Sequence, residues 1–263
     1  MNQENTIAKL LQPESFSITD QGTRTYQQDM CFTEVRDSYG IAVLCDGMGG
    51  MNGGEHASKL AVDSFSEDFR KAQPIRDIPA FLEQEVRKLD RMVTEMQDEQ
   101  GRRMNAGTTL VAVVVTGNQL YWVSVGDSRM YLIRDENMIC MTAAHNYKSM
   151  LREKFDRGEI DMDYYNSEIS QGEALTSYLG IGNLTLIDRN TNPFKLIEDD
   201  ILLLCSDGLY KTLTDEQIKA LINESGYHVQ IAGQRLIDTA RRWGVRGQDN
   251  TTLVLLHMSV ESK

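Results

Sequence analysis

The stretch Ile41-Ala-Val-Leu-Cys-Asp46-Gly47 is a short apolar run that ends in an aspartate and a glycine. Two later runs also end in an aspartate, and a fourth begins with one: Leu120-Tyr-Trp-Val-Ser-Val-Gly-Asp127, Ile201-Leu-Leu-Leu-Cys-Ser-Asp207-Gly208 and Asp249-Asn-Thr-Thr-Leu-Val-Leu-Leu256. Apolar runs this short, bounded by Gly or Asp, are typical of buried strands. If the last strand runs antiparallel to the others, the four aspartates lie at one edge of a sheet. Since carboxylates repel one another unless a cation lies between them, the pattern indicates a metal site.

Turn signals and apolar spacing predict the other elements. Thr116-Gly-Asn-Gln119 separates two apolar runs and indicates a hairpin, and we expect an opening pair of strands at residues 16–19 and 30–35. We expect helices at residues 55–72, 81–96 and 229–243, with Thr214-Asp-Glu-Gln217 as the capping box of a further helix. Strands and helices come in groups, which predicts a single α+β domain over residues 1–263 with antiparallel sheets. Residues 145–171 are polar and weakly periodic, which indicates a helical, flap-like insertion.

Charge and cysteine usage exclude several classes of protein. The 263-residue chain has a formal net charge of −12, which argues against binding to nucleic acid or to an anionic membrane. Its four cysteines form no C-x-x-C pair, so we expect reduced thiols rather than disulfides or a zinc site. The first residues lack the features of a signal peptide, and no apolar run approaches the ~20 residues of a membrane span. We therefore expect a cytoplasmic protein.

The four aspartates also indicate which metal the site could hold. Carboxylate oxygens are hard ligands that favour Mg²⁺ or Mn²⁺, and none of the four histidines has the spacing of a zinc-binding motif. Two such ions that share a bridging carboxylate can generate a hydroxide and hold a phosphoryl group. A single Asp-Gly pair is most often a plain turn, but several at the ends of core strands favour a metal site.

Seven short motifs follow one another along the chain. They are Arg24-Thr-Tyr-Gln-Gln-Asp29, Leu44-Cys-Asp-Gly-Met-Gly-Gly50, Ala106-Gly-Thr-Thr109, Val125-Gly-Asp-Ser-Arg129, Leu175-Thr-Ser-Tyr-Leu-Gly180, Cys205-Ser-Asp-Gly-Leu209 and Gln248-Asp-Asn-Thr-Thr252. Together they resemble the metal-dependent PP2C-type (PPM) serine/threonine protein phosphatases, and in particular the bacterial form with Asp-Gly-Met-Gly-Gly. The resemblance runs from about residue 16 to residue 256. Each motif alone is weak, whereas the ordered set is specific.

The resemblance implies a central antiparallel β-sandwich flanked by helices on both sides, a four-layer α/β/β/α arrangement with metals in a cleft at one end. It implies two Mn²⁺ or Mg²⁺ ions and allows a third, weakly bound one. Asp46 would bridge the two ions, and the backbone carbonyl of Gly47 would bind one of them. Asp207 and Asp249 would complete the shell of the second ion. Asp127 would join Asp207 at the third ion.

The resemblance also assigns roles outside the metal shell. Arg24 would hold the substrate phosphate, because a guanidinium fork matches two phosphate oxygens. Asp29 would hold the waters around the ions. Relatives of the animal type have a histidine, assigned as general acid, where this chain has Met48, and a glutamate where it has Gln28; the general acid is therefore not identified. His145 lies in a segment like the family's Thr-x-Asp-His, and we expect it to be structural or to face the substrate.

These observations predict an enzyme, a protein serine/threonine phosphatase that hydrolyses phosphoserine and phosphothreonine by in-line attack of a metal-bridging hydroxide. Its partners would be phosphorylated proteins, the substrates of a serine/threonine kinase that it counteracts, and we expect a monomer. Two alternatives stay open: a regulatory phosphatase with one dedicated partner protein, and a non-catalytic binding module of the same fold. Three residues also have plainer interpretations: Arg24 as a surface arginine, Asp127 as a turn cap and Asp249 as a turn residue.

Overall fold

The computed structural model describes residues 11–37, 39–49, 53–244 and 247–260. Residues 1–10, in which the sequence shows no signal peptide, lie outside the described residues, as do residues 50–52, which include the last glycine of the motif around Asp46. Within the described ranges, no helix is long and apolar enough to cross a membrane.

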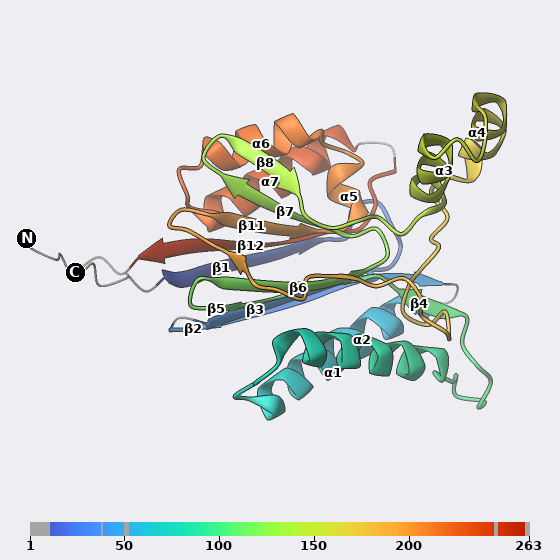
Figure 1. Ribbon diagram of the computed structural model, residues 1–263, viewed down its shortest axis with the longest axis horizontal. Helices are drawn as coiled ribbons and strands as arrows, with labels where there is room; N and C mark the ends of the chain where they lie inside the picture. Colours follow the sequence, from blue (N-terminus) through green and yellow to red (C-terminus); the bar gives the residue numbers. More distant parts are fainter. Residues whose placement is uncertain (1–10, 38, 50–52, 245–246, 261–263) are drawn as a thin grey trace, which may run out of the picture.

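Two antiparallel sheets form the centre of the fold (Figure 1). The five-stranded sheet has the order β1 (Leu11–Asp20), β12 (Thr251–Val260), β11 (Ile201–Cys205), β7 (Arg129–Arg134) and β8 (Asn137–Cys140). The seven-stranded sheet has the order β10 (Phe194–Lys195), β6 (Gln119–Val125), β5 (Leu110–Thr116), β3 (Tyr39–Gly49) and β2 (Asp29–Arg36), with β4 (Ala106–Thr108) paired to β3 and β9 (Asp188–Arg189) to β6. The predicted α+β class with an antiparallel sandwich is confirmed.

The predicted opening pair of strands is wrong in its pairing. Both strands exist, but β1 pairs with β12 in one sheet and β2 pairs with β3 in the other. The apolar pattern identifies a strand from its buried face, and it does not identify the partner that receives its backbone hydrogen bonds. The hairpin predicted around residues 116–119 is confirmed, since β5 pairs with β6 in antiparallel register.

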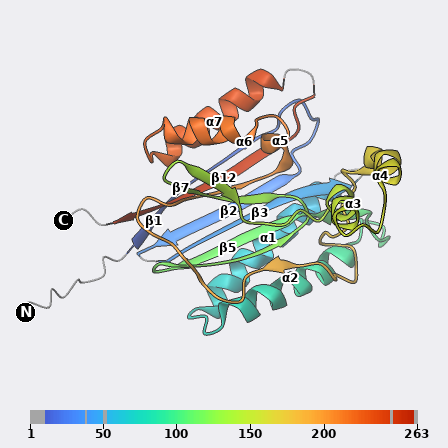
Figure 2. The same ribbon diagram turned by 45° about the horizontal axis from the view of Figure 1, so that its top comes forward.

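Helices cover the outer face of each sheet and complete four layers (Figures 1 and 2). The seven-stranded sheet is covered by α1 (Gly53–Ala72) and α2 (Ile78–Thr94). The five-stranded sheet is covered by α5 (Asp207–Tyr210), α6 (Asp215–Asn223) and α7 (Val229–Trp243). The predicted capping box at the start of α6 is confirmed, because Thr214 and Gln217 each bond the other's backbone amide.

Strand β3 shows how the layers pack. Ile41, Val43 and Cys45 face α1 and α2, whereas Ala42 and Leu44 face the five-stranded sheet. All five side chains are fully buried. Successive residues of a strand point to opposite faces, so a strand covered on both faces is apolar at every position. A third apolar cluster lies between the five-stranded sheet and α5–α7.

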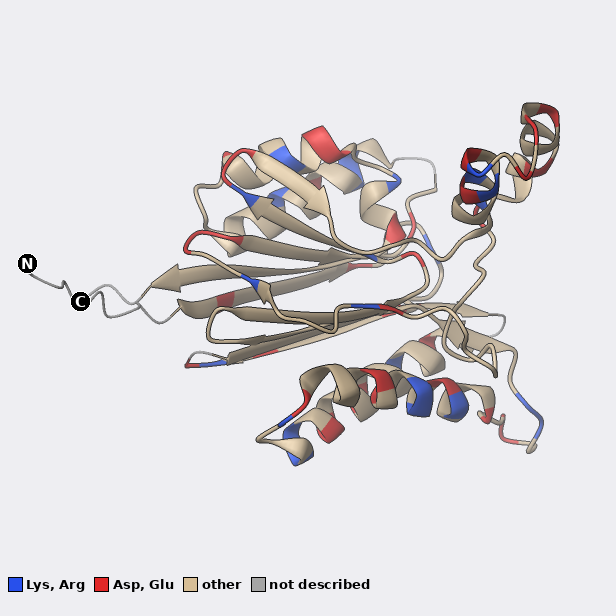
Figure 3. Ribbon diagram, viewed as in Figure 1, with Lys and Arg blue, Asp and Glu red and all other residues tan. Residues whose placement is uncertain are grey.

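Residues 145–171 contain α3 (Tyr147–Asp156), α4 (Met162–Glu168) and the short 3₁₀ helix η1 (Ile169–Gln171). These helices project from the end of the sandwich that lies away from the start of β1 and the end of β12 (Figure 1). Their apolar contribution is small, since Leu151 is the one buried residue of the three helices. Charged residues gather on the helices and at the strand ends, and the strand interiors are largely uncharged (Figure 3).

Candidate active site

The four aspartates identified from the sequence line a single pocket of about 290 Å³. It lies where β3 ends and α5 begins. These two points are at the end of the sandwich opposite the start of β1 and the end of β12 (Figure 1). Asp46 lies within β3 and Asp127 follows β6, while Asp207 begins α5 directly after β11, and Asp249 precedes β12. Strands β3 and β6 both run antiparallel to β5, and β11 runs antiparallel to β12, so all four positions reach the same end.

The expectation that the four aspartates share one edge of one sheet is wrong. Asp46 belongs to the seven-stranded sheet, and Asp127 lies in the connection from β6 of that sheet to β7 of the five-stranded sheet. Asp207 and Asp249 lie next to β11 and β12 of the five-stranded sheet. The pocket therefore spans the ends of both sheets, across the seam of the sandwich. An apolar run that ends in an aspartate does not specify its sheet, because both sheets are covered on both faces.

Asp46 is surrounded by other aspartates. Its backbone is fixed to Thr109, whose hydroxyl oxygen accepts from the Asp46 amide at 3.0 Å and whose amide donates to the Asp46 carbonyl at 2.8 Å. Burial raises the pKa of the Asp46 carboxyl well above its usual range, and the charges of four other aspartates, at positions 29, 207, 127 and 249, raise it further. Without a cation, burial and the neighbouring charges favour the protonated form of this carboxyl group.

Asp29 lies directly opposite Asp46 in the β2–β3 pair and is almost fully buried. Its Oδ2 accepts a hydrogen bond from the Ser206 hydroxyl at 2.7 Å, whereas its Oδ1 is buried without a partner among the described residues. Burial raises the pKa of Asp29 to about 7, although the bonds from Ser206 and Thr252 act in the opposite direction. A buried carboxylate with a free oxygen beside a second carboxylate is the environment that a cation or its bound water would satisfy.

Two of the pocket carboxylates contact basic side chains. Arg24 Nη2 lies 2.6 Å from Asp249 Oδ2, and Lys211 Nζ lies 2.8 Å from Asp207 Oδ2. Arg24 is 59% exposed, and its hydrogen bond to Asp249 is the main cause of the raised pKa of its guanidinium. Arg24 thus lies on the lining of the pocket with its guanidinium largely exposed, and its role toward the substrate stays a prediction.

Glycines allow the backbone to close tightly around the pocket. A Cβ on Gly47 would lie 2.1 Å from the carbonyl oxygen of Gly54, and a Cβ on Gly208 would lie 2.1 Å from that of Asn250. Both contacts are much shorter than any real Cβ contact. The glycine of each Asp-Gly pair is thus required by a close approach of two backbone segments, which places its aspartate at the pocket.

Asn250, which lies in the last of the seven motifs, holds the segment that carries Arg24, a role that the sequence did not reveal. Its side chain accepts from the Gln28 amide at 2.8 Å and donates to the carbonyls of Gln21 and Tyr26 at 2.8 and 3.0 Å. These bonds hold residues 21–28, which carry Arg24, against the start of β12. A run of polar residues directly before an apolar strand was the available signal.

Lys211 and Glu173 also line the pocket and were not identified from the sequence. Lys211 follows Asp207 by four residues, the spacing of a helical ion pair, and this spacing could have revealed it. Met48 lines the pocket but has no proton to donate. His145 lies outside the pocket lining and is nearly buried: its amide donates to the Gly126 carbonyl at 2.8 Å, and its Nδ1 accepts from the Gly126 amide at 3.2 Å.

The donor set of the pocket fits hydrated divalent cations. Within the described part of the chain, no three His, Cys, Asp or Glu side chains come together closely enough to enclose an ion by themselves. An ion here would take some of these carboxylates and complete its shell with backbone carbonyls and waters, as Mg²⁺ usually does in proteins. The free oxygen of Asp29 and the raised pKa of Asp46 are the features that such ions would relieve.

Comparison with known proteins places these features in a family. The family model described as Protein phosphatase 2C matches residues 21–235. The chain is 27% identical to the serine/threonine phosphatase stp of Listeria welshimeri, over 88% of this chain and 89% of the relative. It is 31% identical to the protein phosphatase PhpP of Streptococcus pneumoniae, over 93% of this chain and 97% of the relative.

The solved structures give a similar result. The serine/threonine phosphatase PstP/Ppp of Mycobacterium tuberculosis superposes with a TM-score of 0.79 at 28% identity, covering 95% of this chain and 100% of that one. The catalytic domain of PstP in complex with two manganese ions superposes with a TM-score of 0.76 at 28% identity, covering 95% of this chain and 99% of that one.

Proposed function

This chain belongs to the protein phosphatase 2C family, and on that premise we propose that it hydrolyses phosphoserine and phosphothreonine in proteins at the pocket lined by its four aspartates. The observation that carries the proposal is the convergence of Asp46, Asp127, Asp207 and Asp249 from both sheets on one pocket, with Arg24 on its lining. A pocket crowded with carboxylates would repel a phosphate monoester, so catalysis here requires bound cations.

Two Mn²⁺ or Mg²⁺ ions would bind in this pocket; the catalytic domain of PstP has been solved in complex with two manganese ions. Asp46 would lie between the ions, with the Gly47 carbonyl on one of them and Asp207 and Asp249 on the other. When bound, such ions activate water for in-line attack and neutralise the charge that develops on the phosphoryl oxygens. Asp29, behind Asp46, would orient the waters around the ions through its free Oδ1.

Arg24 would bind the phosphate of the substrate. Its guanidinium is more than half exposed and hydrogen-bonded to Asp249, so it can turn from that carboxylate to a phosphate oxygen without leaving the pocket. The bonds from Asn250 to residues 21–28 keep the backbone of Arg24 in place during this turn. Its planar fork gives orientation as well as charge.

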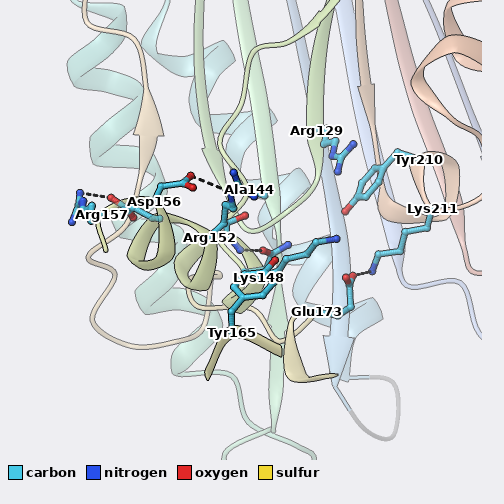
Figure 4. A pocket seen from close by; sticks show the side chains of 13 residues that line it. Arg129, Ala144, Lys148, Arg152, Asp156, Arg157, Tyr165, Glu173, Tyr210 and Lys211 are labelled. Carbon is cyan, nitrogen blue, oxygen red and sulfur yellow. Dashed lines mark hydrogen bonds and ion pairs between the residues drawn. The ribbon is translucent and has the colours of Figure 1, made fainter. Parts of the chain in front are cut away.

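Residues 145–171 would act as a flap that contributes to substrate choice. Between α3 and the end of α5 lies a groove of about 920 Å³, shown in Figure 4, which shares Glu173 and Lys211 with the active-site pocket. Loops held at the edge of a rigid scaffold commonly determine specificity. Replacing residues 147–171 by a short linker should lower activity on phosphoproteins more than activity on a small aryl phosphate; equal losses would assign these residues to the fold instead.

Partner and location form the finer part of the proposal. The substrates would be phosphoproteins produced by a serine/threonine kinase that this enzyme counteracts, and the chain would act as a monomer. All four cysteines are free, with Cys45 and Cys205 fully buried, which favours a reducing compartment such as the cytoplasm.

A direct test measures turnover of a phosphothreonine peptide and of a small aryl phosphate against Mn²⁺ concentration. Hydrolysis of both should rise with Mn²⁺ and stop when a chelator is added. A chain that binds the peptide in Mn²⁺ but releases no phosphate would be a non-catalytic binding module. Turnover that is unaffected by chelator would contradict the metal-dependent mechanism.

A further inference from the structure

Lys211 lies between carboxylates from three segments of the chain. Its Nζ is 2.8 Å from Asp207 Oδ2 and 2.7 Å from Glu173 Oε2, and the second contact is visible in Figure 4. Asp127 lines the same pocket, and the positive charge of Lys211 lowers the pKa of Asp127 against the larger effect of burial. The ammonium group therefore contacts Asp207 and shares a pocket with Asp127, the two aspartates that the family resemblance assigns to a third ion.

The local structure holds Lys211 in this position. Its backbone amide closes the single turn of α5 by donating to the Asp207 carbonyl at 2.9 Å. The preceding residue, Tyr210, donates its hydroxyl to the Asp127 carbonyl at 3.0 Å, and its ring is covered by the Arg129 guanidinium at 3.7 Å. The side chain of Lys211 thus starts from an anchored backbone, and the residue lines both the active-site pocket and the groove.

The electrostatics of Lys211 differ from those of an ordinary surface ion pair. Burial opposes its charge, but hydrogen bonds to Asp207 and Glu173 outweigh that effect and raise the pKa of its ammonium. The same contact is the main cause of the lowered pKa of Glu173. An exposed lysine that pairs with one neighbour contributes little. Lys211 instead pairs with two carboxylates of the pocket lining, Asp207 and Glu173, and Glu173 directly follows the flap.

We propose that Lys211 supplies, through its own ammonium group, the positive charge that a third divalent ion would supply at Asp127 and Asp207. A divalent ion at this position would lie beside a resident positive charge, which disfavours its binding. The chain therefore saturates with two ions. Lys211 is a positioning residue: it holds Asp207 toward the pocket and Glu173 toward Asp207. This inference rests on the two-ion site proposed above.

Metal stoichiometry tests the proposal without relying on turnover. Equilibrium dialysis against excess Mn²⁺ should give two ions per wild-type chain and a third, weaker ion in Lys211→Gln. Adding Asp127→Asn to Lys211→Gln should remove the third ion again. Lys148→Gln is the matched control, because Lys148 lines the same groove but not the active-site pocket; it should bind two ions.

A conservative variant separates charge from damage to the fold. Lys211→Arg keeps the positive charge and should bind two ions, as the wild type does. Three ions in wild type, or two in Lys211→Gln, would overturn the proposal. Failure of the proposed function gives a different result, since wild type would then bind no ions in the pocket and show no turnover.

Discussion

Strand β11 has an aspartate near each end, and the two have opposite surroundings. Asp200, before the strand, is fully buried; Arg134 donates to both its oxygens at 2.7 Å, and the Ile197 amide donates at 2.8 Å. Asp207, after the strand, shares its pocket with three other aspartates and is paired with a partly exposed lysine. A carboxylate whose charge is balanced by an arginine stabilises the fold. A group of neighbouring carboxylates repel one another, and a bound cation can relieve that repulsion.

The largest effect should come from the pocket end of this comparison. Asp46→Asn removes the carboxylate that would contact both ions, and turnover of a phosphothreonine peptide in saturating Mn²⁺ should fall at least ~10²-fold. Circular dichroism should show an intact fold, because we find no hydrogen-bond partner for the Asp46 carboxylate among the described residues. Wild-type turnover in this variant would assign the pocket to another role.

A substitution at Asp200, at the other end of β11, should change stability rather than activity. Asp200→Asn leaves Arg134 and the Ile197 amide with a weaker acceptor, so the free energy of unfolding in urea should fall by about 2 kcal/mol. The folded fraction should keep its Mn²⁺-dependent turnover, because Asp200 is not part of the pocket. An Asp200→Asn variant that is as stable as wild type but inactive would show that Asp200 serves catalysis rather than the fold.

Arg24 tests whether charge on the pocket lining serves the substrate or the metals. Arg24→Ala should lower kcat/KM on a phosphopeptide about tenfold, mainly through KM, because it removes a contact to the phosphate. The Mn²⁺ concentration for half-maximal activity should change less than KM does. A larger change in the metal requirement would show that Arg24 acts on the ion site through Asp249.

The stabilisation of the folded chain by metal should depend on pH, because two carboxyl groups at the pocket have raised pKa values. The pKa of Asp29 is about 7 in the folded chain, and the pKa of Asp46 is raised. The stability that the folded chain gains from protonation of these two groups is therefore fully present below about pH 4, and it is lost as the pH rises through 7. The Mn²⁺-induced rise in melting temperature should therefore be smaller at pH 5.5 than at pH 8 by a few degrees, measured by calorimetry. An equal rise at both values would contradict the raised pKa values. The pKa of Asp127 is also raised by burial and acts in the same direction, whereas the other carboxylates outside the pocket are common to both metal states and cancel.

Local patterns in the sequence predicted the α+β class with antiparallel sheets and the four aspartates at the ends of apolar runs, whereas the four layers were expected from the family resemblance. Residues 41–45 of strand β3 are all apolar, because helices cover one face of the strand and a sheet covers the other, and such a run is visible in the sequence alone. The assignment of β1 and β2 to different sheets was not predictable in this way, since it depends on which edges meet after folding.

The parts of the site that were missed depend on long-range approach. Lys211 contacts Asp207 on its own helical turn, but its second partner, Glu173, belongs to a distant segment of the chain. Asn250 acts by holding residues 21–28, near the other end of the sequence. A single polar residue gives no sign of such a partner, whereas an aspartate at the end of an apolar run stands out.

Thermal unfolding of Asp46→Asn with chelator and with Mn²⁺ tests the central claim, that repulsion among the pocket carboxylates is relieved by bound cations. Ions that bind only the folded state add RT ln(1 + [L]/Kd), about 2.7 kcal/mol at a hundredfold excess over Kd, so wild type should gain several degrees in Mn²⁺. In chelator, Asp46→Asn should melt above wild type, because one repelling charge is gone, and its gain in Mn²⁺ should be much smaller. Asp200→Asn, the control, should melt below wild type in both conditions and keep the full gain. An Asp46→Asn chain that melts below wild type in chelator and keeps the full gain in Mn²⁺ would contradict the claim.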